Sequence, residues 1–348
     1  MRANEAEIAH LEELYADRRA YFGELHNHAK TGGTADGLRT LSHWRGAMEA
    51  LKMDFAAILD HKQVRHMFQE EWEDGLFIGG TEPGTGILDS KAEVKSMHYN
   101  MVFTGPEPLM ELLTEFEEYG FTGGKEGHFN YPRFTTERFG ELIDRVKEKG
   151  GFFVHPHPKQ LMKSDDPLDY VFRDQTGLEV FYGDMANAHT AANYDLWMGV
   201  LAAGRRIWAV AGGDNHACAD DRALNTIYAE SRTNKAYLDH LREGDFVCGS
   251  VGIKMCIGDQ KMGGSCSFAG KKLILSVADF HRSVKNPEHT YRVDIINDHG
   301  VVWSEEFSCT EPVVLSLETE PCAYYRAEVF DVNRNLRIAI GNPIWNDE

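Results

Sequence analysis

Short apolar runs alternate with longer mixed stretches through the first two thirds of the chain. Each run is short enough to form one buried β-strand. The runs are Tyr21–Leu25, Phe55–Leu59, Leu76–Gly80, Met97–Phe103, Gly151–Val154, Gly177–Phe181 and Ile207–Ala211. Helices are predicted over Ala3–Arg19, Ser42–Lys52, Pro108–Tyr119, Thr136–Lys149, Thr190–Ala203 and Asn234–Glu243. Strands that alternate with helices indicate an α/β protein built on a parallel sheet or barrel. The stretch Gly120–Thr135, rich in glycine, aromatic and charged residues, is predicted to be a long loop over one end of the barrel.

The pattern changes after about Phe246, where strand-like runs follow one another with only turn signals between them. These runs are Leu273–Val277, Tyr291–Ile296, Val301–Glu305, Val313–Leu317, Tyr324–Phe330 and Leu336–Ile340. They predict a small antiparallel β-domain of the sandwich type. The chain is therefore expected to divide into a first domain over residues 1–248 and a C-terminal β-domain over residues 249–348.

The charge balance is acidic, because the 348 residues include 36 Lys plus Arg against 55 Asp plus Glu, a formal net charge of −19. Such a surface repels polyanions, so neither nucleic acid nor an anionic membrane is expected as a partner. It favours cation capture, although acidity also serves solubility alone. There is no basic segment followed by an apolar run at the start, no apolar stretch long enough to span a bilayer, and no CxxC pair. A cytoplasmic protein with free thiols is expected.

Histidine and carboxylate residues gather where the predicted strands end. They occur in Glu24-Leu25-His26-Asn27-His28, Leu59-Asp60-His61, Gly80-Thr81-Glu82, His155-Pro156-His157 and Gly213-Asp214-Asn215-His216, while His98 lies within its run. In an extended segment both histidines of His-x-His point to one face, because side chains alternate with period two. Both imidazoles can then reach one metal ion, and Asp214-x-His216 repeats this spacing. Mixed nitrogen and oxygen ligands suit zinc, manganese or iron.

Each fragment by itself also has an ordinary structural explanation. His61 could be a hydrogen-bonded core histidine, and Glu82 could be a helix cap or an ion-pair partner. Glu179 could be a plain carboxylate at a strand end, or it could support a metal ligand without touching the ion. The ordered set indicates a metal centre because the C-terminal strand ends of a barrel meet at one face.

This ordered set resembles the polymerase and histidinol phosphatase (PHP) superfamily of metal-dependent hydrolases over roughly Tyr21 to Glu243. The segment Leu241–Phe246, which leads into a glycine-marked β-segment, and the closing Gly341-Asn342-Pro343-Ile344 are similar to the CehA/McbA-type branch. The resemblance implies a distorted seven-stranded α/β barrel with its metals at the C-terminal ends of the strands.

The resemblance also implies which residues hold two or three divalent ions. The first ion would be held by His26, His28, Glu82 and Asp214. The second would share Glu82 and would also bind His98 and His155. The third position would take His61 and His216, with Asp36 as the candidate ligand that follows the His-x-His pair. His157 would orient His155 or touch the substrate, or it would simply be exposed beside Pro158.

A divalent ion lowers the pKa of bound water to about 7, so a metal-activated hydroxide is the expected nucleophile. Asp60 or Asp214 could shuttle a proton. Four cations beside the ligand motifs are candidates to bind a phosphate or carboxylate group, or are ordinary solvated charges: Lys30, Lys62, Arg65 and Lys159.

Three functions follow from this chemistry. The first is a phosphoesterase that acts on a small phosphorylated molecule, which the multi-metal site and the flanking cations favour. The second is a hydrolase of a carboxylic ester, amide or carbamate on the same metals, which the similarity to the CehA/McbA-type branch favours. The third is a non-catalytic metal- or ligand-binding protein. The β-domain could cover the barrel, bind substrate or form a homo-oligomer, and its sequence does not choose among these roles.

Overall fold

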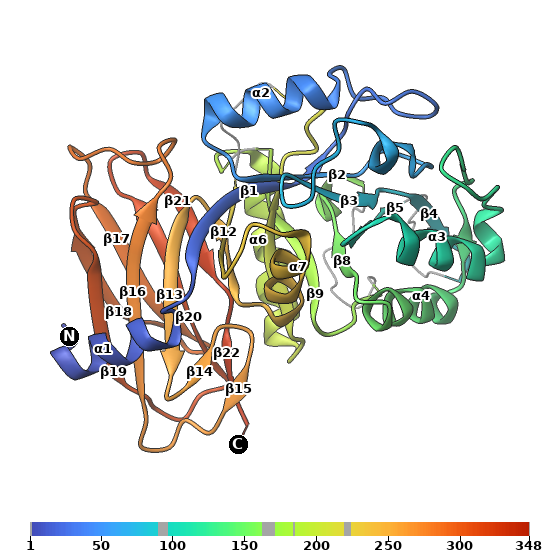
Figure 1. Ribbon diagram of the computed structural model, residues 1–348. Helices are drawn as coiled ribbons and strands as arrows, with labels where there is room; N and C mark the ends of the chain where they lie inside the picture. Colours follow the sequence, from blue (N-terminus) through green and yellow to red (C-terminus); the bar gives the residue numbers. More distant parts are fainter. Residues whose placement is uncertain (1, 90–96, 162–170, 184, 219–223, 348) are drawn as a thin grey trace.

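One large mixed sheet runs through the molecule in the computed structural model, which describes residues 2–89, 97–161, 171–183, 185–218 and 224–347 (Figure 1). Within the described residues, seven neighbouring strands make up its first part, in the order β10-β9-β8-β6-β3-β2-β1. Their bounds are β1 (Arg19–Asn27), β2 (Phe55–Ile58), β3 (Phe77–Thr81), β6 (Asn100–Phe103), β8 (Phe152–His155), β9 (Thr176–Tyr182) and β10 (Ile207–Gly212). Each strand overlaps one of the apolar runs, so the pattern located these strands correctly.

The two ends of this seven-strand run meet beside the segment that follows β10. Asn27, at the end of β1, forms an isolated parallel bridge with Asn215. The His28 N–H donates to the Asn215 carbonyl at 2.9 Å, and the Asn215 N–H donates to the His26 carbonyl at 3.2 Å. These backbone bonds carry the segment around Asp214 to the end of β1.

Strand β6 runs antiparallel to its neighbours β3 and β8, whereas the other pairs in the run are parallel. The prediction of a parallel sheet is therefore wrong for this strand. A parallel connection needs a long crossover, usually a helix. Between β3 and β6 the described chain instead forms the short strands β4 (Gly84–Ile87) and β5 (Met97–His98), which pair with each other, and β6 returns in the opposite direction.

Helices pack against the sheet largely where the sequence predicts them. Their bounds are α1 (Glu5–Leu14), α2 (Leu41–Leu51), α3 (Pro106–Glu115), α4 (Thr136–Glu148), α5 (Pro158–Leu161), α6 (Ala188–Ala202) and α7 (Asn234–Glu243), with 3-10 turns at Arg65–Phe68 and Glu117–Tyr119. Helix α2 begins one residue before the predicted Ser42, and its N-cap is Thr40, whose side chain accepts from the His43 N–H. None of the described helices is long and apolar enough to cross a membrane.

The C-terminal strands form two sheets that share one hydrophobic core. One sheet has the order β14-β13-β16-β19, and β12-β21-β20-β17-β18 continues the large sheet. Buried side chains from both sheets, including Ile253, Leu275, Val293 and Val329, belong to one cluster. The bounds are β11 (Asn225–Ala229), β12 (Phe246–Gly249), β13 (Val251–Ile257), β14 (Gln260–Lys261), β15 (Ser265–Cys266), β16 (Lys272–Phe280), β17 (Tyr291–Asn297), β18 (Gly300–Phe307), β19 (Val313–Glu318), β20 (Tyr324–Asp331), β21 (Leu336–Gly341) and β22 (Ile344–Asn346), with β7 (Arg133–Phe134) beside β4.

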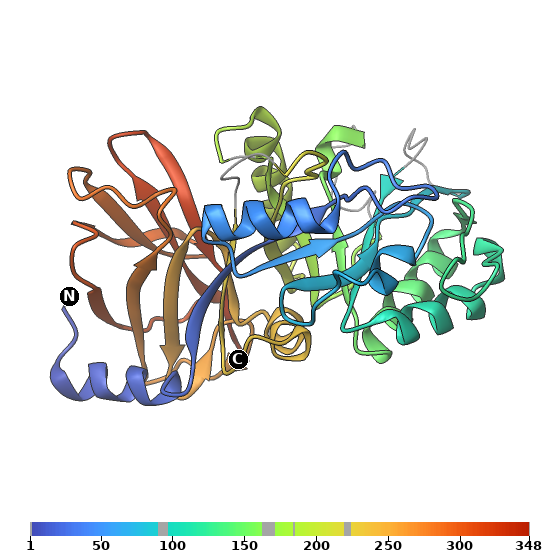
Figure 2. The ribbon, with the colours of Figure 1, turned by 45° about the horizontal axis from the view of Figure 1, so that its top comes forward.

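The N-terminal helix lies with the C-terminal strands, as both ribbon views show (Figures 1 and 2). Lys272 of β16 pairs with Glu7 of α1 at 2.8 Å, and the Tyr15 hydroxyl donates to the Met255 carbonyl of β13. The predicted boundary after residue 248 falls inside β12, which pairs with β11 on one side and β21 on the other. Backbone hydrogen bonds therefore run without a break from the first part of the chain into the C-terminal strands.

Asn342 links the C-terminal end of the chain to the first part of the sheet, which generates a stability prediction. Its buried side chain accepts from the Ala209 N–H of β10 at 2.8 Å and donates to the Phe246 carbonyl of β12 at 3.2 Å. Asn342→Ala leaves both backbone groups without this partner and should lower the free energy of unfolding by about 1–3 kcal/mol. Urea denaturation followed by circular dichroism measures the change, and an unaltered midpoint would contradict the linking role.

Candidate metal centre

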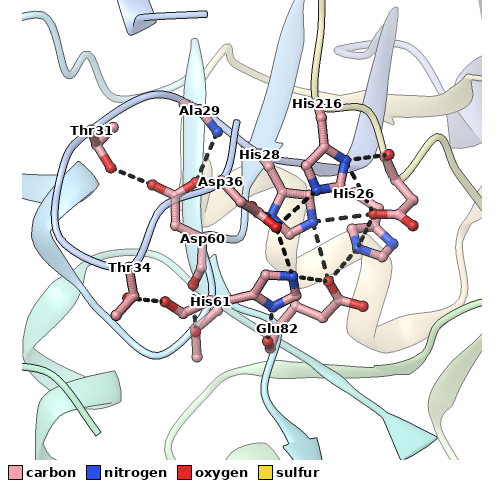
Figure 3. A network of polar contacts seen from close by, with 12 residues as sticks. His26, His28, Ala29, Thr31, Thr34, Asp36, Asp60, His61, Glu82 and His216 are labelled. Carbon is pink, nitrogen blue, oxygen red and sulfur yellow. Dashed lines mark hydrogen bonds and ion pairs between the residues drawn. The ribbon is translucent and has the colours of Figure 1, made fainter. Parts of the chain in front are cut away.

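Imidazoles and carboxylates from separate strands converge on Glu82, which follows β3 and is buried (Figure 3). His26 lies in β1 and His28 directly follows the strand, and the two side chains reach this point on one face, as the period of an extended segment requires. The Nε2 atoms of both histidines lie 3.1 Å from Glu82 Oε2. The His-x-His pair therefore aims two nitrogen atoms at one carboxylate oxygen.

Asp214 completes a first group of four residues with His26, His28 and Glu82, whose ligand atoms all lie within 4.8 Å of one another. Asp214 Oδ1 is 3.3 Å from His28 Nε2 and 3.7 Å from His26 Nε2. Asp214, two residues after the end of β10, has a φ of 46°, in the left-handed region. The bond between Asn215 and the end of β1 supports this turn, which points the carboxylate at the histidines.

A second group contains Glu82 with His98 and His157. Glu82 Oε1, the oxygen that does not face His26 and His28, lies 2.8 Å from His98 Nδ1 and 2.9 Å from His157 Nε2. The two oxygens of one buried carboxylate are therefore shared between the first and the second group.

A third group contains His28, Asp36, His61 and His216. Asp36 Oδ2 lies 3.3 Å from His216 Nε2 and 3.6 Å from His61 Nε2, and Asp36 Oδ1 lies 3.6 Å from His28 Nδ1. The structure thus places Asp36 beside His28, His61 and His216. This group is the more open of the three, because the side chain of Asp36 is 49% exposed.

His155, which is predicted to be a metal ligand, is absent from these three groups of described residues, whereas His157 belongs to the second. The His155 ring packs against Phe153 and Phe172, with ring centres 5.1 and 4.8 Å apart, and burial alone lowers its pKa to about 3. Strand β8 ends at His155, and His157 has a left-handed φ of 28°. Period-two alternation holds only within a strand, so here the two histidines of His-Pro-His do not share a face.

The donor set fits divalent cations. The Nε2 atom of His26 and both ring nitrogens of His28 are buried and have no hydrogen-bond partner among the described residues, while carboxylate oxygens lie close to them. Without a cation, three carboxylates and several imidazoles would have to balance one another by taking up protons. Nitrogen and oxygen donors in such groups are typical of zinc, manganese or iron sites.

The pKa values of His28 and Glu82 are shifted by the charged side chains around them. Burial disfavours the protonated form of His28, but the nearby carboxylates of Asp214 and Glu82 outweigh burial and raise its pKa to about 9. Burial opposes the charged form of Glu82 as well, yet the neighbouring His26 and the hydrogen bond with His157 hold the pKa of Glu82 well below its ordinary value. The carboxylate is therefore ready to accept a cation, whereas His28 must release a proton to do so.

Asp60, predicted as a possible proton shuttle, belongs to none of the three groups of described residues. Its fully buried carboxylate accepts from the Ala29 N–H at 2.8 Å and from the hydroxyl of Thr31 (Figure 3). Gln63 donates to it at 3.3 Å. Asp60 thus holds the start of the loop that carries Asp36, and its role here is structural.

Of the four predicted substrate-binding cations, Lys62 is connected to the site. Its ammonium group lies 4.9 Å from the ring centre of Tyr131, and that ring lies 6.3 Å from His61 and 6.4 Å from His98. Arg65 pairs with Glu126 at 2.6 Å instead. Lys30 is exposed, and Lys159, the second residue of α5, donates its N–H to the Asn193 side chain.

Two tyrosines at the site were not predicted from the sequence. Tyr131 lies on the Gly120–Thr135 loop, and burial together with the charges of Glu82 and Asp36 raises its pKa to about 12. Tyr182, the last residue of β9, donates its hydroxyl to Asp214 Oδ2 at 3.1 Å. The only sequence signal for them was their position, Tyr182 at a strand end and Tyr131 in the loop expected to cover the barrel.

Comparisons with known proteins give partial likenesses. No family model and no curated protein matches the chain. Similar solved structures include the lesion-specific endonuclease Endonuclease Q from Pyrococcus furiosus, with 15% sequence identity, a TM-score of 0.45 and coverage of 64% of this chain and 56% of the endonuclease. A complex of Endonuclease Q with a 27-mer duplex that carries an abasic lesion has 14% identity, a TM-score of 0.41 and coverage of 64% and 57%. A proposed metal-dependent phosphoesterase from Bifidobacterium adolescentis has 17% identity, a TM-score of 0.38 and coverage of 58% and 90%.

The matched part of the chain spans little more than half of Endonuclease Q, and likeness at this level carries no conclusion about activity. It does correct one prediction. The exclusion of a nucleic-acid partner on the ground of net charge is withdrawn, because one of the similar structures is a complex with a duplex substrate. Net charge averages over a whole surface, whereas phosphate binding depends on the local field at the site.

The different surroundings of His155 and His157 generate a direct prediction. His157→Ala should lower the number of divalent ions bound per molecule, because the second group then keeps only Glu82 and His98. His155→Ala should leave that number unchanged while it lowers stability, since it removes a buried ring that packs between phenylalanines. Elemental analysis of both purified variants makes the comparison, and the reverse pattern would restore His155 as the ligand.

Proposed function

We propose that this protein is a metal-dependent phosphoesterase of the PHP type that acts on a small phosphorylated molecule, with divalent ions of zinc, manganese or iron. The observation that carries the proposal is the Glu82 carboxylate, whose two oxygens face histidines of two adjoining groups. A carboxylate shared in this way could bind two neighbouring cations. Two such cations could in turn bind the oxygens of a phosphate ester.

The fold that we propose with this function is a distorted seven-stranded barrel followed by a β-sandwich, with the division near residue 248. The backbone bonds between Asn215 and the end of β1 support closure of the seven-strand run. The shared core of the two C-terminal sheets supports the sandwich. In a barrel the metal groups would lie at the C-terminal strand ends, where catalytic residues of such folds gather.

The ions would supply activated water and would offset the charge of the phosphate. Around them, Asp214 is the residue we assign to proton transfer. Its Oδ1 faces His26 and His28, while its Oδ2 accepts a hydrogen bond from the Tyr182 hydroxyl. A proton can therefore be held or passed on at Oδ2 while Oδ1 stays directed at the first group. Asp60 is not suited to this role, since its carboxylate already accepts hydrogen bonds from the Ala29 N–H and the Gln63 side chain.

Lys62 and Tyr131 are the residues we assign to substrate binding. Tyr131 places a half-exposed ring beside His61 and His98, and its raised pKa keeps the hydroxyl protonated as a donor. Lys62 adds a positive charge at the same edge. The loop is fixed there by the bond from the Phe129 N–H to the Lys62 carbonyl at 3.0 Å. A phosphate oxygen at the site could thus be contacted by one cation and one neutral donor.

The proposed activity is tested with a panel of esters on protein of known metal content. We expect turnover of 4-nitrophenyl phosphate that a chelator abolishes and zinc or manganese restores. Asp214→Ala should lower kcat by more than about 100-fold, because even residues that only support metal ligands contribute about 10- to 100-fold. Turnover of 4-nitrophenyl acetate alone would show a carboxylic ester hydrolase instead. Full metal content without turnover of any ester, including an oligonucleotide, would indicate a binding protein.

The role of Lys62 is tested by Lys62→Met, with Lys125→Met as its control. Lys125 is an exposed cation on the loop that carries Tyr131, so the pair separates a local contact from a general change of charge. Lys62→Met should raise KM for the phosphate ester about tenfold, the equivalent of a charge-assisted contact of about 1.4 kcal/mol. Lys125→Met should leave KM unchanged. Equal effects of the two substitutions would contradict a direct contact with the phosphate.

A further inference from the structure

Glu179 on β9 lies behind the metal groups and is 1% exposed. It belongs to none of the three groups of described residues. We propose that Glu179 is a positioning residue that couples the first and the second group, so that binding of a cation at one prepares the other. This inference rests on the proposed function only in taking the two groups as cation sites.

The first contact of Glu179 fixes the orientation of His26. Glu179 Oε1 lies 3.1 Å from His26 Nδ1, and as a carboxylate oxygen it accepts the proton of that nitrogen. The opposite nitrogen, Nε2, then presents its lone pair toward Glu82 and Asp214. Carboxylates that bind the distal nitrogen of a histidine in this way set its tautomer and make it a better ligand.

The second contact of Glu179 fixes the backbone of His157. Glu179 Oε2 accepts the His157 N–H at 2.7 Å. His157 has a φ of 28°, a conformation that costs a non-glycine residue free energy and persists only where surrounding contacts hold it. The bond to Glu179 is such a contact, and it places the His157 ring so that Nε2 faces Glu82.

The Glu179 carboxylate packs closely against Gly212, the last residue of β10. A Cβ atom at this position would lie 1.7 Å from Glu179 Oε1 and 2.9 Å from the Cβ of His26. The carboxylate therefore fills the space that any other residue at position 212 would need. Glu179 has little freedom to give up one contact in order to improve the other.

These contacts close a ring of four residues, which His157 enters through both its backbone N–H and its imidazole. His26 and His157 each bind Glu179 on one side and face Glu82 on the other. An ion that orders His26 also orders Glu179, and Glu179 in turn orders the backbone of His157. The second ion then binds to side chains that are already ordered, so binding of the first ion raises the affinity for the second.

Glu179→Gln tests this coupling because an amide has one acceptor oxygen in place of two. The glutamine can accept from His26 or from the His157 N–H, but not from both, since its nitrogen only donates. We expect wild-type protein to take up zinc at the two positions cooperatively. The variant should bind at least one of the ions about 10- to 100-fold more weakly. Equilibrium dialysis with elemental analysis measures this without any substrate.

Two further variants sharpen the test. Glu179→Asp keeps the charge but is one methylene shorter, so it too should lose one contact and the coupling. Glu328→Gln is the control, because Glu328 is equally buried and binds Arg326 and Arg337 in the C-terminal sheet. It should keep wild-type zinc binding whatever it does to stability. Wild-type affinities in both Glu179 variants, or losses equal to those of the control, would overturn the proposal.

A measurement on wild-type protein decides the matter if the variants do not fold. Nitrogen-15 spectra of histidine-labelled, zinc-loaded protein should show His26 protonated at Nδ1. Protonation at Nε2 would overturn the positioning role. These readouts are separate from turnover, so coupled zinc binding in a protein that hydrolyses no phosphate ester would refute the proposed function and leave the role of Glu179 standing.

Discussion

The burial of Glu82 among histidines is the constraint on which the site depends. Its Oε2 faces His26, His28 and His61, and its Oε1 faces His98 and His157. A carboxylate this deeply buried is costly unless positive charge compensates it. Protonated imidazoles can do so, but divalent cations do so better, and they also use the buried imidazole nitrogens that have no hydrogen-bond partner among the described residues.

The sequence predicted the parts of this arrangement that regular secondary structure dictates. His26 and His28 lie on one face because β1 is extended through Asn27. The same rule failed for His155 and His157, because β8 ends between them and the backbone turns into a left-handed conformation. The direction of β6 was missed because an apolar run carries no sign of its orientation. Such features depend on how the chain turns after a strand, which periodicity does not record.

Residues that shape the site without belonging to the metal groups were the hardest to predict. Asp60 stands beside His61 in a motif that suggests chemistry, yet it binds the loop that delivers Asp36. Tyr131 arrives from a loop whose path the sequence leaves open. Glu179 could be named from its strand end as a possible support for a metal ligand, but its two partners, His26 and His157, are distant in the chain and could not be named. Each of these roles is set by tertiary packing, which residue type alone does not specify.

Diffraction from crystals of the zinc- or manganese-loaded protein, collected at the absorption edge of the metal, tests the central claim most directly. The account predicts two or three anomalous peaks, each bounded by the side chains of one of the three groups, with Glu82 between the first two. Fully loaded crystals with no peak beside Glu82, or with peaks only at surface carboxylates elsewhere, would contradict it.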